Sequence, residues 1–266
     1  MSINSSSVWA DLSQIRENAP LVHNITNYVV MNTTANALLS LGGSPIMAHA
    51  IEEVAIIAGI SGALVVNIGT LSQHWITAMK MAVEAAKQAS VPIVIDPVGA
   101  GATPYRTETV HALMSLAAPT IIRGNASEIK ACVTDEAKTK GVDSVDSSDS
   151  AVEAAQQLNA TYGSTVVVSG ATDFIVGGDA IIQVQNGHEM MTKVTGMGCT
   201  ATAVCGAFAA VNTNAPIAAA HAMAVMGIAG EMAAVQAKGP GTLQLHFLDA
   251  LYTMTEADIA NRLATA

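Results

Sequence analysis

The sequence predicts an α/β protein with a mostly parallel central sheet, helices on both faces and an antiparallel edge. Strand-like and helix-like segments alternate along most of the 266 residues, at a spacing of about 25 to 30 residues that is typical of βαβ units. Residues 63–68 form a continuous apolar run, as expected of a parallel strand covered on both faces. Gly177-Gly178-Asp179 separates two further apolar runs, which indicates a hairpin at one edge of the sheet.

The first half of the chain follows this alternation closely. One-sided apolar spacing predicts a first helix at 7–18, and an apolar run predicts a strand at 21–25. Thr26 or Asn27 is expected to cap the next helix, which runs to about residue 40 and stops at two glycines. The remaining expected elements are strand 45–48, helix 51–59, strand 63–68, helix 71–89, strand 92–96, helix 105–116, strand 120–123 and helix 127–133.

The second half begins with a polar stretch at 135–150, which is expected to be a surface excursion because the alternation resumes directly after it. A turn at Asn186-Gly187 leads into 190–194, which is expected to add a second antiparallel hairpin. The other expected elements are helix 150–162, strands 165–170, 174–179 and 180–184, and helices 199–211, 216–236 and 243–254. Since no linker interrupts the pattern, residues 1–266 are expected to form a single domain.

The composition excludes several classes of partner. A formal charge of -10 with only 11 Lys and Arg disfavours nucleic acid, whose binding depends on phosphate neutralisation. The longest apolar segment, 217–235, contains His221 and Glu231, so a buried helix is expected there instead of a membrane span. The amino-terminal residues lack the charged and apolar regions of a signal peptide, which favours a cytoplasmic protein.

The turn Gly196-Met197-Gly198-Cys199 is the strongest candidate site, because a helix of small residues begins there. Glycine allows a positive φ and a close approach of the backbone to a ligand. The unpaired amides and the positive dipole end of such a helix favour an anion, for example a phosphate group. The same field is expected to lower the pKa of the Cys199 thiol. A tight turn with a buried cysteine would give the same pattern.

Polar residues follow several of the expected parallel strands, where ligands bind in open α/β sheets. Asp96 precedes a glycine-rich loop, and a carboxylate in that position suits Mg²⁺ held jointly with substrate phosphates. Arg123 and Ser169 end two further strands, and Arg123 is a candidate contact for nucleotide phosphates. Glu128 could lie in the outer shell of the same metal. Simple capping of turns and helices would also explain Asp96 and Glu128.

Three other chemistries are disfavoured. The chain lacks the Gly-x4-Gly-Lys-Ser/Thr motif of P-loop nucleotide binders. Gly196-x-Gly198-x-x-Ala201 matches a dinucleotide fingerprint, but only helices follow it and the first downstream carboxylate is Glu231. Hydrolysis by Cys199 with His188 or His221 lacks an evident Asn or Asp partner, and His221 lies in an apolar helix, where a core histidine is more common than a base.

Taken together, seven short motifs resemble the hydroxyethylthiazole kinase family of the ribokinase-like superfamily. They are collinear from about residue 20 to Gly239-Pro240-Gly241-Thr242: Asn24-Ile-Thr-Asn27, Asn36-Ala-Leu-Leu-Ser40, Gly43-Ser-Pro-Ile-Met47, Asn67-Ile-Gly-Thr70, Asp96-Pro-Val-Gly99, Arg123-Gly-Asn-Ala-Ser-Glu128 and Gly196-Met-Gly-Cys199. The resemblance implies a three-layer ribokinase-like fold. It also implies ATP-dependent phosphorylation of the hydroxyl of 4-methyl-5-(2-hydroxyethyl)thiazole, a step of thiamine salvage.

The resemblance assigns roles to individual residues of this chain. It implies that Met47, Gly196 and Asn27 line the thiazole pocket. It further implies that Arg123 and Ser169 contact ATP and that Asp96 and Glu128 serve Mg²⁺. Members of the family are trimers with sites between subunits, so a homotrimer is expected.

Cys199 stands where related sugar kinases carry a base aspartate, so a thiolate there could accept the proton of the substrate hydroxyl. Phosphoryl transfer needs little help from a base at first, and Cys199 is therefore expected to matter for geometry and only modestly for rate. Met197 departs from the small or β-branched residue expected at its position. Two alternatives stay open: a sensor that has lost catalysis, and a sister kinase that acts on a pyrimidine or a sugar alcohol.

Overall fold

The computed structural model describes residues 2–133 and 147–266. Every strand in these ranges belongs to one eight-stranded sheet with the order β2-β1-β3-β4-β5-β6-β7-β8. The pairs from β2 to β6 are parallel, and β7 and β8 complete the sheet as an antiparallel edge. The strands are β1 Leu21–Ile25, β2 Ser44–Ile46, β3 Ala63–Asn67, β4 Ile93–Asp96, β5 Ile121–Asn125, β6 Thr165–Ser169, β7 Asp173–Gly177 and β8 Ala180–Val184.

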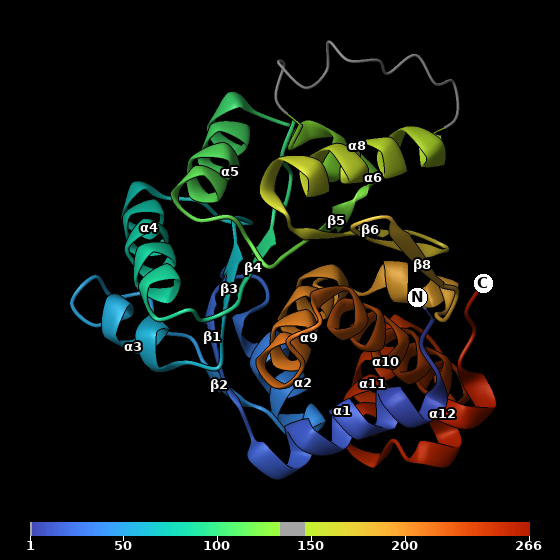
Figure 1. Ribbon diagram of the computed structural model, residues 1–266. Coiled ribbons are helices and arrows are strands. Elements are labelled where there is room, and N and C mark those ends of the chain that lie inside the picture. The colour runs from blue at the N-terminus through green and yellow to red at the C-terminus, as the bar shows by residue number, and fades with distance from the viewer. Residues whose placement is uncertain (1, 134–146) are drawn as a thin grey trace.

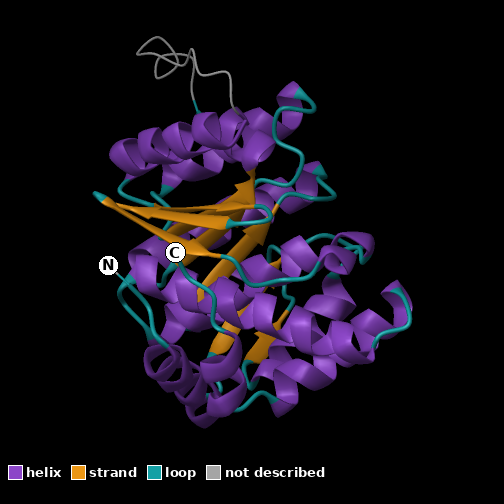
Figure 2. Ribbon diagram, turned by 90° about the vertical axis from the view of Figure 1, so that its right-hand side faces the viewer, coloured by secondary structure: helices purple, strands orange, loops and turns teal. Residues whose placement is uncertain are grey.

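Helices cover both faces of the sheet, which makes three layers (Figure 1). One face carries α3 Val54–Ile60, α4 Gln73–Gln88, α5 Pro104–Leu116, α6 Ala126–Ala131 and α8 Ser147–Tyr162. The other face carries α1 Ser5–Asn18, α2 Met31–Leu41, α9 Met197–Val211, α10 Ala215–Gln236, α11 Pro240–Thr253 and α12 Glu256–Arg262. Figure 2 shows the sheet running between these two layers. The expected α/β class, parallel sheet and antiparallel hairpin are confirmed.

Helix α9 lies close against the centre of the sheet because its inner face is made of small residues. Gly206 shows how close: a Cβ at this position would come within 2.5 Å of Cγ2 of Val65 on β3. Contacts with β1, β3 and β4 hold the helix across the parallel strands. This packing brings the amino end of α9 to the carboxyl ends of those strands.

Helix α10 is the one described helix whose length and hydropathy would allow it to cross a membrane. In the fold, 78% of its apolar window is buried, because it packs against α9, α11 and the antiparallel edge of the sheet. The expected buried helix is confirmed.

Several expected boundaries are wrong. Helix α2 begins at Met31 and not at 26 or 27, because Asn27 turns its side chain toward β3 and caps no helix. Helix α3 begins at Val54, since 51–53 form a turn. Most of the excursion expected at 135–150 lies outside the described residues, and α8 already begins at Ser147.

The second hairpin is also absent from the described sheet. The segment expected as a strand at 190–194 is largely a 3-10 helix, η1 Glu189–Lys193. Glu231 accepts hydrogen bonds from the Gly187 amide at 3.0 Å and from the Asn186 side chain at 2.9 Å, which turns the chain onto α10. The edge of β8 instead meets Thr265 in a single antiparallel bridge. Helix α12 was not expected from the sequence.

Candidate active site

The carboxyl ends of the central parallel strands bring three buried polar side chains into one hydrogen-bonded chain. Asn67 and Asp96 are register partners at the ends of β3 and β4. Asn67 donates to Asp96 Oδ2 at 2.7 Å and accepts from the side-chain amide of Asn27 at 2.8 Å. Thr202, on the second turn of α9, donates to the same Asp96 oxygen at 2.8 Å. The sheet and α9 therefore meet at Asp96.

Asp96 is 1% exposed, and its burial determines its proton affinity. Removal of the carboxylate from water raises the pKa of Asp96 to about 6, and the charge of Glu128 adds to the rise. The Arg123 guanidinium and the hydrogen bonds from Thr202 and Asn67 lower the pKa of Asp96 without reversing the shift. A carboxyl group whose pKa lies so far above its ordinary value is typical of a functional site.

The turn before α9 requires both of its glycines. Gly196 is the N-cap of the helix, with a φ of 85°, and a Cβ there would come within 2.6 Å of Cγ1 of Val30. A Cβ on Gly198 would come within 2.7 Å of Nη1 of Arg123. The first helical bond runs from the Thr200 amide to the Gly196 carbonyl, so the amides of the preceding turn stand at the positive end of α9. The helix begins two residues earlier than expected.

Cys199 lies in this first turn, half-buried, and accepts a hydrogen bond from Asn27 Nδ2 at 3.5 Å. Burial raises the pKa of the Cys199 thiol, and the nearby Asp96 carboxylate raises it further. Bonds from Asn67 and Asn27 and the charge of Arg123 act in the opposite direction but do not prevail. The expected lowering of this pKa is therefore wrong, because desolvation outweighs the field of the helix end.

Arg123 lies in the middle of β5 and not, as expected from the sequence, at its end, but it is joined directly to Ser169 at the end of β6. Arg123 donates from Nη2 to Ser169 Oγ at 2.8 Å, and Ser169 also donates to the Gly124 carbonyl at 3.2 Å. Nε of Arg123 is buried and has no hydrogen-bond partner among the described residues. A guanidinium with free donors beside the amino end of α9 is suited to bind phosphate.

Glu128 forms a capping box with Asn125 at the start of α6, as one of the two readings of the sequence expects. Its Oε2 accepts from the Asn125 amide at 2.9 Å. Its Oε1 accepts from the Gly99 amide at 2.9 Å, which ties the loop after β4 to α6. Glu128 therefore joins two neighbouring loops of the rim, the one after β4 and the one after β5.

Two cavities open at this rim. The smaller, of about 210 Å³, is lined by Asp96, Val98, Arg123, Asn125, Glu128, Ser169, Gly196, Gly198 and Cys199. The larger, of about 620 Å³, lies between the antiparallel edge, η1, α9 and α10, and Arg123 is its one Lys or Arg side chain. Arg123, Ser169 and Gly198 line both cavities. A smaller chamber, lined mainly by polar and charged side chains, and a larger cleft thus share one arginine.

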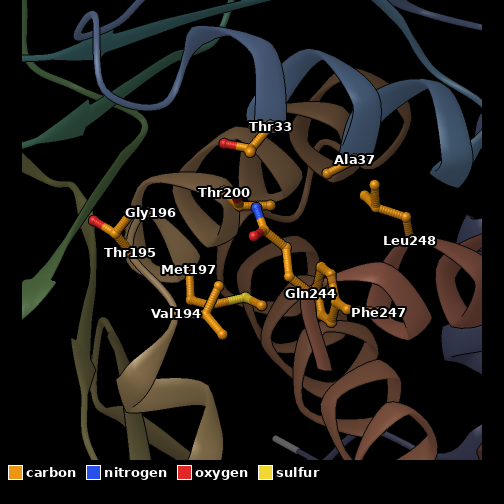
Figure 3. Close-up of a pocket in the computed structure, with 10 residues that line it drawn as sticks. All are labelled: Thr33, Ala37, Val194, Thr195, Gly196, Met197, Thr200, Gln244, Phe247 and Leu248. Carbon is orange, nitrogen blue, oxygen red and sulfur yellow. The ribbon is translucent and has the colours of Figure 1, made fainter. Parts of the chain in front are cut away.

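A third hollow, of about 20 Å³, lies behind the turn between α2, α9 and α11. Figure 3 shows the Gln244 amide reaching from α11 toward Thr200, with Phe247 beside it. Met197 lines this hollow and the 620 Å³ cleft, and is not among the residues that line the 210 Å³ cavity. The departure at Met197 therefore alters the cleft and not the chamber at Asp96.

The donor set suits Mg²⁺ shared with a substrate phosphate. In the described ranges no three His, Cys, Asp or Glu residues are grouped to hold a metal, whereas Mg²⁺ usually takes one or two carboxylates plus phosphate oxygens and water. Both hydrogen bonds to the Asp96 carboxylate go to Oδ2, which leaves Oδ1 for a cation. Both oxygens of Glu128 accept backbone amides, so this side chain suits the outer shell.

The structure gathers most of the expected site residues, with one exception. Asn27, Asp96, Arg123, Glu128, Ser169, Gly196 and Cys199 meet at the rim through the contacts described above. Met47 follows the edge strand β2 and does not line either of the two larger cavities at the rim. Its expected contact with the thiazole is not tested by this arrangement.

Two residues that organise the rim were missed. Thr202 lies three residues after Cys199 on the same helix, so helical spacing from Cys199 could have revealed it. Arg106 donates to the carbonyls of Ile68, Gly69 and Val98 at 2.6 to 3.0 Å and joins the loops after β3 and β4. No local pattern in the sequence marks Arg106.

The cysteine-hydrolase alternative is disfavoured by the placement of the histidines. His221 is buried on α10, where Nδ1 lies 2.6 Å from Asp11 and Nε2 lies 3.0 Å from Ser7. His188 caps η1 through Nδ1. Neither histidine is bonded to Cys199 in the part of the chain that the structure describes.

Comparison with known proteins agrees with this geometry. A hydroxyethylthiazole kinase from Syntrophus aciditrophicus is 61% identical over 264 residues, which cover 99% of this chain and 98% of the relative. The structure of hydroxyethylthiazole kinase from Pyrococcus horikoshii matches with a TM-score of 0.91 at 40% identity and 98% coverage of both chains. Pyridoxal kinase from Staphylococcus aureus covers 80% of this chain with a TM-score of 0.59 at 17% identity, a likeness of fold alone.

The expected three-layer, ribokinase-like fold is thereby confirmed. The profile of one family spans residues 12–257 of this sequence. On this match, together with the 61% identity over nearly the whole length, the chain belongs to the hydroxyethylthiazole kinase family.

Proposed function

We propose that this protein transfers the terminal phosphoryl group of ATP to the hydroxyl of 4-methyl-5-(2-hydroxyethyl)thiazole, a step of thiamine salvage. Besides family membership, one observation carries the proposal. A 210 Å³ polar chamber at the amino end of α9 adjoins a 620 Å³ cleft, and the two share Arg123, Ser169 and Gly198. The chamber suits the reacting groups and the cleft suits the nucleotide.

The nucleotide is held by Arg123 and Ser169 in this proposal. The guanidinium lies against Gly198 in the first turn of α9, so it and the backbone amides of that turn face the same space. Their combined positive field stabilises the charge on the phosphoryl group in transit. This use of backbone amides fits a chain with only 11 Lys and Arg.

The thiazole is bound by Met47, Asn27 and Gly196. Asn27 is fixed by its bonds to Asn67 and Cys199, so its position beside Cys199, which lines the chamber, is defined before substrate arrives. Gly196 offers backbone at the chamber wall. Met47, which follows the edge strand β2, contacts the thiazole in the assembled protein.

Cys199 contributes geometry and a modest part of the rate. Its raised pKa keeps the thiol protonated near neutral pH, which suits a residue that places the substrate hydroxyl and does not remove its proton early. Asp96, with a pKa raised to about 6, and Glu128 hold Mg²⁺, directly and through its outer shell respectively. The metal supplies charge neutralisation on the phosphates when bound.

The functional unit is a homotrimer with sites between subunits. Several large apolar side chains are exposed, notably Tyr28 after β1 and Ile56 and Ile60 on α3, of which the last two are 67% exposed. Large exposed apolar side chains of this kind are candidates for burial between subunits. Each protomer forms a single cytoplasmic domain. Size-exclusion chromatography with light scattering tests the trimer, because it measures the mass of the assembly in solution.

The test of function is phosphate transfer from ATP to hydroxyethylthiazole by the purified protein, with and without Mg²⁺. Metal-dependent formation of the thiazole phosphate is the expected result. A folded protein that binds the thiazole without transfer would indicate a sensor. A protein that neither binds nor phosphorylates it, but accepts a pyrimidine or a sugar alcohol, would indicate a sister kinase.

A further inference from the structure

The segment Met47-Ala48-His49 lies where the sheet ends. Strand β2 pairs with β1 at three positions only, and the last pair is His23 with Ile46. Beyond Ile46 no ladder bond fixes the backbone, and all three residues are partly exposed. Figure 1 shows β2 at the edge of the sheet, leading toward α3. A residue placed on this segment keeps its position only if something else holds the chain.

His23 supplies that hold. Its side chain is 0% exposed, and Nε2 lies 2.7 Å from the carbonyl oxygen of Ala48. A carbonyl can only accept, so Nε2 carries the proton and donates it. The bond crosses from β1 to the segment two residues past the last ladder pair.

The surroundings of the His23 ring keep it neutral, with its single proton on Nε2. Nδ1 is buried without a hydrogen-bond partner among the described residues, so a second proton there would be an unsatisfied buried donor. Burial lowers the pKa of His23, against smaller opposing effects of the Ala48 carbonyl and of Glu53. The neutral ring with its proton on Nε2 is therefore the form that binds Ala48.

A second contact holds the far end of the segment. His49 Nδ1 lies 3.2 Å from the Met47 carbonyl, and the His49 ring packs on Trp75 with centroids 4.7 Å apart. Trp75 is buried on α4 and also contacts Tyr28, at 5.0 Å. The segment is thus fixed from β1 by His23 and from α4 by Trp75.

We propose that His23 is a positioning residue for the thiazole: through its bond to the Ala48 carbonyl it fixes the backbone that presents Met47 to the substrate. The inference rests on the proposed function, because the contact of Met47 with the thiazole does. His23 lies on β1 and lines neither the chamber of the reacting groups nor the nucleotide cleft. Its loss should therefore weaken thiazole binding and leave ATP binding and the chemical step largely intact.

The decisive variants are His23→Leu, which removes the donor, and His23→Gln, whose amide nitrogen can replace Nε2. For His23→Leu we expect KM for the thiazole to rise about tenfold, the equivalent of ~1.4 kcal/mol. Its kcat and its KM for ATP should stay within about threefold of wild type. His23→Gln should restore most of the thiazole affinity. His111→Leu is the matched control, because His111 also bonds a backbone carbonyl, that of Cys132 at 3.1 Å, away from the segment.

Amide exchange of residues 44–50 gives a readout that does not depend on activity. Faster exchange there in His23→Leu, but not in His111→Leu or His23→Gln, would support the positioning role. Equal exchange in all three, or a thiazole KM that Gln does not restore in a folded protein, would overturn it. If His23→Leu does not fold, His23→Asn replaces it in both measurements, because the shorter amide does not place a donor at the position of Nε2. A wild-type protein without thiazole transfer would instead refute the proposed function, and the exchange result would still decide whether His23 holds the segment.

Discussion

Replacement of Asp96 by Asn should make the protein more stable and much less active. The variant keeps an oxygen that can accept from Asn67 and Thr202, at the positions where they now donate at 2.7 and 2.8 Å. It removes a charge that burial disfavours. A pKa of about 6 in place of 3.8 corresponds to about 3 kcal/mol at 1.36 kcal/mol per pKa unit. The free energy of unfolding should rise by up to that amount at pH 7.

The pH dependence provides an internal check. A carboxyl whose pKa is raised in the folded state keeps its proton to a higher pH there than in the unfolded chain. The free energy of unfolding of the wild type therefore falls as the pH rises from 3.8 to about 6, and this titration changes it no further above pH 6. Asp96→Asn lacks this titration. Its advantage over wild type should therefore be largest above pH 6 and should vanish near pH 4.

The assay is urea unfolding at pH 4, 5 and 7.5, together with kcat/KM for thiazole phosphorylation at pH 7.5. Loss of the charge at the proposed metal position should lower kcat/KM by roughly 100-fold or more. Asp179→Asn, in the exposed hairpin turn, is the control and should change neither quantity. A less stable Asp96→Asn, or a stable variant with normal activity, would refute the reasoning.

Three further variants test other parts of the site and the core. Cys199→Asp should keep activity, within about tenfold of wild type, because a carboxylate also accepts a proton; complete loss in a folded enzyme would contradict this. Gly198→Ala places a Cβ 2.7 Å from Nη1 of Arg123. Because small misplacements at a reacting centre are costly, it should lower kcat/KM for ATP by roughly 100-fold. Steady-state kinetics measures this, and an unchanged kcat/KM would contradict the role of the turn. Asp11→Ala removes the hydrogen-bond partner that now lies 2.6 Å from the buried His221 and should cost about 1–3 kcal/mol of stability in urea. An unchanged unfolding midpoint would contradict a stabilising role of this hydrogen bond.

Patterns within single elements were enough for much of the fold. The strand at Leu21–Ile25 and the hairpin between β7 and β8 follow from apolar runs and turn residues that are adjacent in the sequence. The strand predicted at 190–194 is wrong because the structure of this segment depends on contacts with residues far along the chain. Met191 packs against Gly230 on α10, and no strand pattern can reveal that a distant glycine leaves room for it.

The candidate site, too, could be predicted from the sequence only in part. Asp96 and Arg123 could be placed at one rim because parallel strands end on one edge. The proton affinity of Cys199 could not be predicted, since it depends on how deeply Asp96 and the thiol are buried together. Arg106, which joins two rim loops, acts only after folding brings three carbonyls to it.

The arginine shared by the two cavities makes the affinities of the two substrates depend on each other. A nucleotide that draws the Arg123 guanidinium into the cleft changes the potential in the chamber, and a ligand in the chamber changes the potential in the cleft. Thermodynamic linkage requires the two effects to be equal, so ATP alters thiazole affinity by the same factor as thiazole alters ATP affinity. Arg123 therefore couples the two binding sites, whichever substrate binds first.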